Sequence, residues 1–274
     1  MSKAGGQKPG ARPLIPLIAA GALVLVAILA PWISGYAPDA IDLAGRRAAP
    51  SATHWFGTDD LGRDLLTRVL YGARVSLMIG ILAATLTVAL GAGIGTVAGW
   101  VGRWVDAVLM RAADAILAVP RLPLLMLASV ILRPGVLLLI VLVASVSWVE
   151  TARVVRAEVR SLATRGFVEA ARAVGSGALQ SMWRHIMPNV LPTLAVATTL
   201  AVGRSILLES AMSFFGVGVQ PPTASWGNML YQAQATMATE PWLALFPGAA
   251  ILVSVLTVNA LGERLDVRRT GPRA

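Results

Sequence analysis

Few residues in this sequence could carry out nucleophilic or acid–base chemistry. The chain has no cysteine and two histidines, His54 and His185, so thiolate nucleophiles and disulfides are excluded. Its lysines are Lys3 and Lys8, whereas a GxxxxGK[ST] phosphate loop needs a lysine at the start of a helix. The sequence therefore excludes a P-loop ATPase on this chain, and we expect it to carry no catalytic residue, no metal and no cofactor.

One group of residues has the types that bind metals: His54, Asp59, Asp60 and Asp64. The same carboxylates suit a surface helix, because Thr58 or Asp59 could cap its first turn and Asp64 could pair with Arg68. We therefore predict a solvated amphipathic helix here and prefer it to a metal site.

A serine hydrolase is the other chemical interpretation. Ser176 lies between Gly175 and Gly177, and His185 follows nine residues after Ser176. A G-x-S-x-G nucleophile elbow is missing, because Val174 precedes Gly175. Ser176 and His185 also fall in a charged loop between apolar segments, so we set this hypothesis aside.

The composition is that of a membrane protein. Hydrophobic side chains make up 56% of the 274 residues and charged side chains 14%, whereas about a quarter of residues in a soluble domain are charged. The mean hydropathy is +0.71. The net charge of +9 lies in tails and short loops, which suits orientation in lipid better than contact with nucleic acid.

Six apolar segments could cross a hydrocarbon core of roughly 30 Å. Four of them are uncharged, namely residues 13–38, 75–102, 134–149 and 241–262. Two contain charges, namely residues 112–132, with Asp114 and Arg121, and residues 190–209, with Arg204 and Glu209. The first is too long for a signal peptide and lacks a clean cleavage site, so we expect an uncleaved anchor.

The sequence therefore predicts an all-α integral membrane protein with six transmembrane helices. The predicted parts are a cytoplasmic tail (1–12), a first helix (13–38), an outer segment with the amphipathic helix (39–74), a five-helix core (75–262) and a second tail (263–274). Most basic residues lie in the tails and in a loop over residues 150–188, while five aspartates balance five arginines in residues 39–74. This asymmetry predicts that both termini are cytoplasmic.

Three glycines, Gly91, Gly95 and Gly99, recur every fourth residue in the second predicted helix. This spacing predicts a face on which another helix backbone packs closely. The alternative is that glycine is simply common in membrane helices.

The loop 150–188 contains a short amphipathic pattern. Phe167, Ala171 and Val174 are spaced to share one face of a helix that ends at Gly175 and Gly177. The residues alone leave two alternatives, a solvated connector with a membrane-surface helix and a loop that docks a partner protein.

This loop resembles the EAA loop of the inner-membrane permeases of bacterial ABC importers. The matching residues are Glu169-Ala170-Ala171, then Gly175 after three intervening residues, and a hydrophobic segment that closes at Pro188. Met187-Pro188 stands where the family has Leu-Pro.

Further segments resemble the dipeptide, oligopeptide and nickel branch of this family, specifically its C-type subunit. They are Phe56-Gly57-Thr58-Asp59, Leu61-Gly62-Arg63-Asp64, the runs 185–189 and 209–216, Pro221-Pro222, and the run 226–230. Ala224 stands where a proline is usual. The resemblance covers about residues 10–266.

The resemblance implies a multi-pass permease of the bacterial inner membrane with a cytoplasmic coupling helix between its fourth and fifth spans. The implied partners are a second permease, forming a heterodimer, two cytoplasmic ATPase subunits and an external substrate-binding protein. The residues that carry over to ATPase coupling are Glu169, Ala170, Ala171 and Gly175, to which the helical face adds Phe167 and Val174. Dipeptides, longer peptides, nickel chelates and glutathione-like molecules remain alternative substrates.

Arg204 and Glu209 are then candidates for the translocation pathway, because charges within a span are costly unless they are paired or face water. They lie about 140° apart around a helix, so they should not pair with each other. Arg204 could meet a peptide carboxylate or bond to a carbonyl of a neighbouring helix. Arg121, between Pro120 and Pro123, indicates a locally broken helix.

The main rival is a secondary transporter or channel subunit without ATPase partners. Ion coupling usually leaves several carboxylates in the spans, and the candidates here are Asp114 and Glu209. An inverted repeat between the two halves is not apparent. A purely structural anchor would not need the apolar face at residues 167–174.

Overall fold

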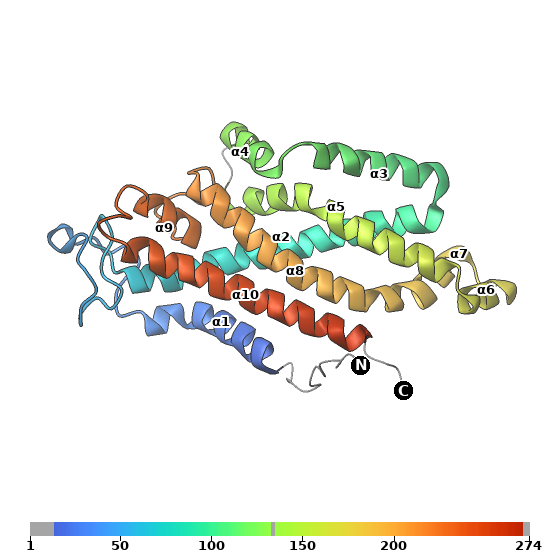
Figure 1. Ribbon diagram of the computed structural model, residues 1–274, viewed down its shortest axis with the longest axis horizontal. Coiled ribbons are helices and arrows are strands. Elements are labelled where there is room, and N and C mark those ends of the chain that lie inside the picture. The colour runs from blue at the N-terminus through green and yellow to red at the C-terminus, as the bar shows by residue number, and fades with distance from the viewer. Residues whose placement is uncertain (1–13, 133–134, 271–274) are drawn as a thin grey trace, which may run out of the picture.

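The computed structural model describes residues 14–132 and 135–270, and within them the only extended pairing is an isolated bridge between Thr58 and Asp64. The prediction of an all-α fold is confirmed. Figure 1 shows an elongated helical bundle. We call its two ends the α6 end, where α6 and α7 lie, and the α9 end, where α9 and residues 34–64 lie.

In chain order, the helices are α1 (Leu14–Ile33), η1 (Leu43–Gly45), α2 (Leu65–Val101), α3 (Arg103–Ala118), α4 (Arg121–Leu132), α5 (Val136–Ala163), α6 (Gly166–Ala173), α7 (Ala178–Ser181), η2 (Met182–Ile186), α8 (Met187–Phe214), α9 (Trp226–Ala233) and α10 (Trp242–Thr270). The η1 segment is a 3-10 helix and η2 is a π-helical turn.

Five helical segments of the described residues are long and apolar enough to span a membrane: α1, α2, α5, the run from α7 through α8, and α10. Helices α3 and α4 make a sixth if they count as one span, with an 85° bend between them. The bend lies at Val119 and Pro120, which separate the two helices. The predicted break beside Arg121 is therefore confirmed.

The prediction of a separate amphipathic helix before residue 75 is wrong. Helix α2 begins at Leu65 and is continuous, and its N-cap is Asp64, which accepts a hydrogen bond from the backbone N–H of Thr67 at 2.8 Å. Asp59 does not cap a helix. It accepts hydrogen bonds from the N–H groups of Leu61 (2.9 Å) and Arg63 (3.0 Å) and so closes a turn.

The predicted loop over residues 150–188 is shorter in the structure, because α5 continues to Ala163 and α8 begins at Met187. Charged residues on this extension of α5 bind α3. Asp106 of α3 accepts a hydrogen bond from Arg156 at 2.5 Å and pairs with Arg160 at 3.3 Å. The charges at Glu150 and beyond mark the end of the apolar run, while the helix itself goes on.

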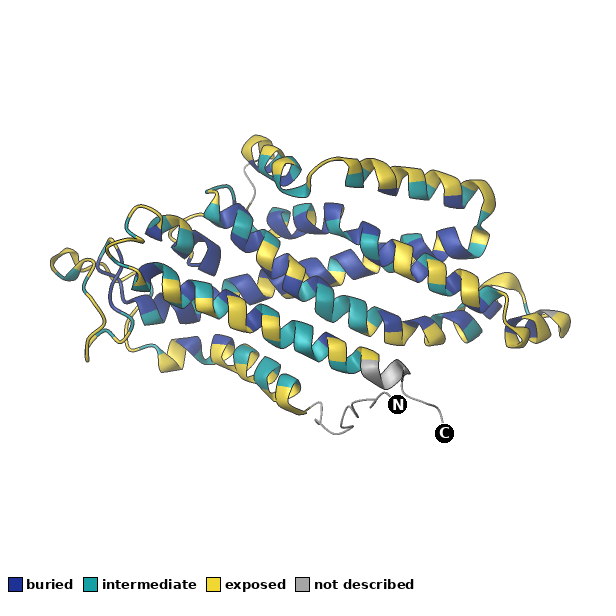
Figure 2. Ribbon diagram, in the orientation of Figure 1, coloured by how far each residue is buried: buried dark blue, intermediate teal, exposed yellow. Residues whose placement is uncertain are grey.

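The bundle is built around α2, which packs closely on α5. A Cβ atom on Gly91 would lie 2.8 Å from the carbonyl oxygen of Trp148, and one on Gly99 would lie 2.8 Å from that of Arg156. A Cβ atom on Gly95 would overlap the carbonyl oxygen of Ala152. Figure 2 shows the consequence, with buried residues concentrated on α2 and α5 and exposed residues prevailing on α1.

Parts of the predicted tails lie outside the described residues, namely residues 1–12 and 271–274, as does Pro134 at the predicted start of the fourth span. The remainder of the predicted tail 263–274 is helical, because α10 continues to Thr270.

Candidate functional site

Helix α6 lies beyond the end of α5 and is held there by apolar packing, chiefly that of Val168. Val168 is fully buried in a cluster with Val159 and Leu162 of α5, Ile186 of η2 and Val190 of α8. Apolar contact of this kind is the main stabilising force available to a helix of eight residues, which is too short to be stable alone. The position of α6 is therefore fixed by the ends of α5 and α8.

The predicted coupling residues divide into an inner and an outer set. Ala171 is buried, whereas Phe167 is 41% exposed and Val174 is 85% exposed. Glu169 and Ala170 are exposed. Val174 follows the end of α6, so the face predicted for Phe167, Ala171 and Val174 does not continue along one helix.

Gly175 ends this segment in a left-handed conformation with φ of +89°. The N–H of Ser176 donates to the carbonyl of Ala171 at 3.0 Å, and the N–H of Val174 donates to that of Ala170 at 3.2 Å. Glycine suits this position because a Cβ atom is disfavoured at positive φ. The backbone then turns into α7 and η2, where His185 lies with its ring 6.5 Å from that of Phe167.

Exposed apolar side chains gather at this end of the bundle. Besides Phe167 and Val174, they include Leu179 of α7 and Trp183 of η2. We call these four residues the α6 surface. Leu179 and Trp183 were not predicted from the sequence, although their apolar character beside the EAA-like segment was a signal for them.

A cavity of about 280 Å³ lies among α2, α4, α5, α8 and α10. The charged residues in its lining are Arg121, Glu150, Arg204 and Asp266. Thr193, Ala197, Leu200 and Arg204 contribute from one face of α8, spaced at three to four residues.

Glu150 joins two arginines in this cavity. Its Oε1 accepts a hydrogen bond from Nη2 of Arg121 at 2.6 Å, and its Oε2 pairs with Nη1 of Arg204. The Arg204 side chain is 55% exposed. Arg204 was predicted from the sequence as a pathway residue. Glu150 was not, because it follows an uncharged segment directly and was assigned to a loop.

Glu209 lies in a different environment from Arg204. It is 1% exposed and accepts hydrogen bonds from the hydroxyls of Ser213 at 2.8 Å and Ser76 at 3.1 Å. The same Ser76 hydroxyl accepts a hydrogen bond from the backbone N–H of Trp226 at 3.2 Å. Glu209 does not line the cavity; it connects α8 to α2 and, through Ser76, to α9.

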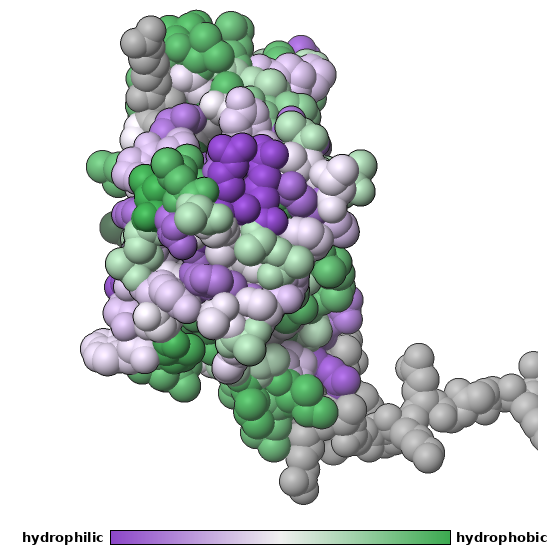
Figure 3. Space-filling model, turned by 90° about the vertical axis from the view of Figure 1, so that its left-hand side faces the viewer, coloured by the Kyte–Doolittle hydropathy of each residue, from purple (hydrophilic) through white to green (hydrophobic). Residues whose placement is uncertain are grey.

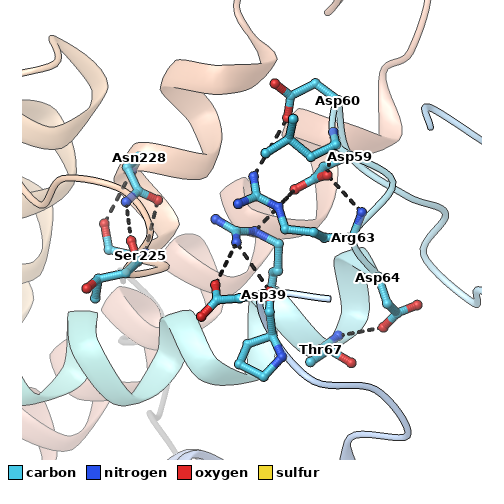
Figure 4. A network of polar contacts seen from close by, with 12 residues as sticks. Asp39, Asp59, Asp60, Arg63, Asp64, Thr67, Ser225 and Asn228 are labelled. Atoms are coloured by element: carbon cyan, nitrogen blue, oxygen red, sulfur yellow. Dashed lines mark hydrogen bonds and ion pairs between the residues drawn. The ribbon is translucent and has the colours of Figure 1, made fainter. Parts of the chain in front are cut away.

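The α9 end holds a network of polar contacts, shown in Figure 4. Asp59 binds Arg63 at 2.7 Å and Arg68 at 3.3 Å, and Arg68 is 1% exposed. The predicted pair of Asp64 with Arg68 is wrong, because Asp64 caps α2 and binds Nδ1 of His54 at 2.9 Å.

The four residues that have metal-binding types therefore make other contacts: a helix cap and ion pairs. They are His54, Asp59, Asp60 and Asp64. In the ranges that the structure describes, no three His, Asp or Glu residues are placed to hold a metal ion. Figure 3 views this end and shows hydrophilic side chains gathered near its centre, with hydrophobic ones above and below.

The matches to known proteins agree with this arrangement. The family of binding-protein-dependent transport system inner membrane components matches residues 91–271. A peptide permease protein of Brucella suis biovar 1 is 39% identical over 236 residues, which is 85% of this chain and 78% of that protein. A peptide transport system permease protein of the same organism is 42% identical over 243 residues, or 89% of this chain and 82% of that protein.

The glutathione transport system permease protein GsiD of Escherichia coli O6:K15:H31 is 41% identical over 244 residues, or 89% of this chain and 80% of that protein. The matched family region contains α6 and the cavity residues Arg121, Glu150 and Arg204. With five or six apolar spans in the described residues, the chain belongs to the family of binding-protein-dependent transport system inner membrane components, as a permease subunit of an ABC importer.

Proposed function

We propose that this permease imports short peptides or related small solutes, and that separate ATPase subunits drive it through α6. The support for the substrate class is that similar proteins are named for peptide and glutathione transport. The sequence has no lysine after Lys8, so a phosphate loop of the usual kind is not available on this chain. ATP hydrolysis is therefore assigned to the partner subunits.

The observation that carries the coupling proposal is the α6 surface. Phe167, Val174, Leu179 and Trp183 are exposed apolar residues at the α6 end of the bundle. An apolar patch of this kind marks a surface that lipid or another protein covers. Val168 anchors α6 to the ends of α5 and α8. Displacement of α6 by an ATPase would therefore be transmitted to two spanning helices.

The α6 end is assigned to the cytoplasm. Arg153, Arg156, Arg160 and Arg165 lie on the α5 extension and the link to α6, which agrees with the cytoplasmic preference of basic residues. The α9 end would then face the external binding protein, and the exposed carboxylates of Asp39 and Asp60 would meet water there.

The cavity that contains Arg204 is assigned to the translocation pathway. It lies between helices that the coupling surface can move, and its charged side chains are accessible. Glu209 is assigned a structural role instead, because serine hydroxyls satisfy it away from the cavity. A second permease of similar type, forming a heterodimer, would complete the pathway.

The coupling proposal is tested by purifying the tagged chain from its native membrane in mild detergent. We expect an ATPase subunit to copurify with the wild type and its recovery to fall at least about tenfold with Val174→Asp, Glu169→Lys or Gly175→Asp, since each introduces or reverses a charge at the proposed contact. Val174→Asp is the cleanest of these, because Val174 makes few contacts within the chain.

Ile41→Asp is the matched control, because Ile41 is an exposed apolar residue at the α9 end. Its ATPase recovery should equal that of the wild type. An ATPase that stays bound in all three α6 variants would refute the coupling surface. Solute uptake that needs no ATP would instead support a secondary transporter or channel, which the family assignment disfavours.

A further inference from the structure

The cavity contains an ion cluster in which one glutamate pairs with two arginines. Arg121 begins α4, Glu150 lies on α5 and Arg204 lies on α8, and the single carboxylate of Glu150 pairs with both guanidinium groups. Each guanidinium has five N–H donors, and these pairs use few of them. The two arginines therefore keep donors for a further acceptor.

These charges are accessible from the cavity. The side chain of Arg204 is 55% exposed, and those of Glu150 and Arg121 are partly exposed. A purely structural ion pair in a membrane protein is normally enclosed by neighbouring helices, whereas charges that face a cavity mark a pathway for a polar solute. Partial exposure also means that a solute can reach the guanidinium groups without unfolding a helix.

The size and lining of the cavity limit what can bind. Its volume of about 280 Å³ lies just below the range of roughly 300–1,000 Å³ that is typical of small-molecule sites. Its lining combines two arginines and two acidic residues with threonines and small apolar side chains. Such a lining, with both charge signs, fits a small zwitterion better than a large apolar ligand.

We propose that this cavity binds the carboxylate of a small solute on Arg121 and Arg204, in competition with Glu150. Guanidinium groups form short, two-point hydrogen bonds with carboxylates. Glu150 occupies this position when the solute is absent and keeps the two arginines oriented. The inference rests on the proposed function, which assigns the cavity to the translocation pathway, and it adds which chemical group the solute must carry.

Competition predicts effects of opposite sign for the two partners. Loss of Arg204 removes a donor to the solute, so binding weakens. Loss of the negative charge on Glu150 removes the competitor, so binding of a carboxylate becomes tighter. An ion cluster that served only to hold α4, α5 and α8 together would show no such gain with Glu150→Gln.

The chain has no cysteine, which allows a direct test with single introduced thiols. Val154→Cys places a thiol in the cavity lining at an exposed position, and its alkylation by N-ethylmaleimide is followed in the purified permease complex without binding protein. The probes are dialanine and its C-terminal amide, which lacks the carboxylate. Ile41→Cys at the α9 end is the control thiol.

We expect dialanine to slow alkylation of Cys at position 154 severalfold and the amide to have little effect, while the control thiol reacts equally in all cases. Adding Arg204→Gln should raise the half-protecting dialanine concentration about tenfold, and adding Glu150→Gln should lower it about threefold. Arg121→Gln is a second loss variant, should Arg204→Gln fail to elute as a monodisperse complex.

Equal protection by dialanine and its amide, no protection by either, or weaker protection with Glu150→Gln would each overturn the carboxylate site. These results are independent of the coupling test. If the ATPase copurifies and depends on the α6 surface while protection fails, the coupling proposal stands and only the solute site falls.

Discussion

At the scale of single residues, two charges on the same helix have opposite roles. Arg204 and Glu209 are both on α8, yet Arg204 reaches an accessible cavity and Glu209 is buried among serine hydroxyls. A buried carboxylate persists in a span only when its acceptors are satisfied. The hydroxyls of Ser76 and Ser213 meet this requirement and join α8 to α2.

We predict that Glu209→Ala lowers the thermal stability of the purified protein more than Glu209→Gln. Alanine leaves the buried hydroxyls of Ser76 and Ser213 without an acceptor, at about 1–3 kcal/mol, whereas glutamine keeps one acceptor oxygen. The melting temperature, followed by tryptophan fluorescence, should fall by several degrees more for alanine. Equal shifts for the two variants would show that hydrogen bonding does not explain this residue.

At the scale of elements, the start of α2 depends on one side chain. Asp64 accepts a hydrogen bond from the N–H of Thr67 at 2.8 Å and binds His54 at 2.9 Å. The first N–H groups of a helix lack partners within it, so a capping side chain stabilises the whole first turn.

We predict that Asp64→Ala destabilises the protein by about 1 kcal/mol or more through loss of this cap. Asp60→Ala is the matched control, because Asp60 is exposed and has a longer contact of 3.7 Å with Arg63. Urea or thermal unfolding in detergent should separate the two variants. If the Asp60 variant is equally destabilised, the cap is not the cause.

The contact between α2 and α5 is the second feature at this scale. Gly91, Gly95 and Gly99 face the backbone of α5, whereas Gly93 on the same helix has no atom within 4 Å of an added Cβ. Close approach of two backbones increases the number of dispersion contacts, which drive helix association in lipid. A side chain is therefore excluded at Gly91, Gly95 and Gly99 but has room at Gly93, although all four glycines lie in the same stretch of α2.

We predict that Gly95→Ala destabilises the protein by about 1–3 kcal/mol, because the new methyl group overlaps the carbonyl oxygen of Ala152. Gly93→Ala should leave stability unchanged or slightly raised, since alanine favours helix more than glycine does. Thermal unfolding of the two purified variants provides the comparison. A comparable loss of stability in the Gly93→Ala and Gly95→Ala variants would show that the contact with α5 is not the cause.

At the scale of the whole molecule, the two ends differ in chemistry. The α6 end carries a helix with exposed apolar side chains beside arginines, and the α9 end carries a closed network of aspartates and arginines. This difference suits the two partners that we propose, an ATPase at the α6 end and a binding protein at the α9 end. Under the proposed function, motion of α6 would reach the cavity, because α5 and α8 both line the cavity and pack against Val168 of α6.

We predict that a membrane-impermeant maleimide labels Ile41→Cys in intact cells and labels Glu263→Cys only after permeabilisation. Both residues are exposed, and they lie in the outer segment and in the last turns of α10. The natural absence of cysteine makes each thiol specific. The reverse pattern would invert the proposed orientation and remove α6 from the cytoplasm.

The apolar segments by themselves determined the helical class and the approximate spans, because a membrane-spanning backbone must satisfy its own hydrogen bonds over about 20 apolar residues. The EAA-like residues likewise indicated the family. Helix ends were less predictable. The apolar segment ends at Val149, where the charged residues begin, but helix α5 continues. Its charged extension is stabilised because Arg156 and Arg160 bind Asp106 of α3.

Only the tertiary structure decided which charges meet. Arg121 and Glu150 are 29 residues apart and Ser76 and Glu209 are 133 apart in the sequence. No local sequence pattern predicts either pair, because the two residues meet only when α2, α4, α5 and α8 pack together. For the same reason, the sequence could name Arg204 as a pathway candidate but not its partner, and could not separate it from Glu209.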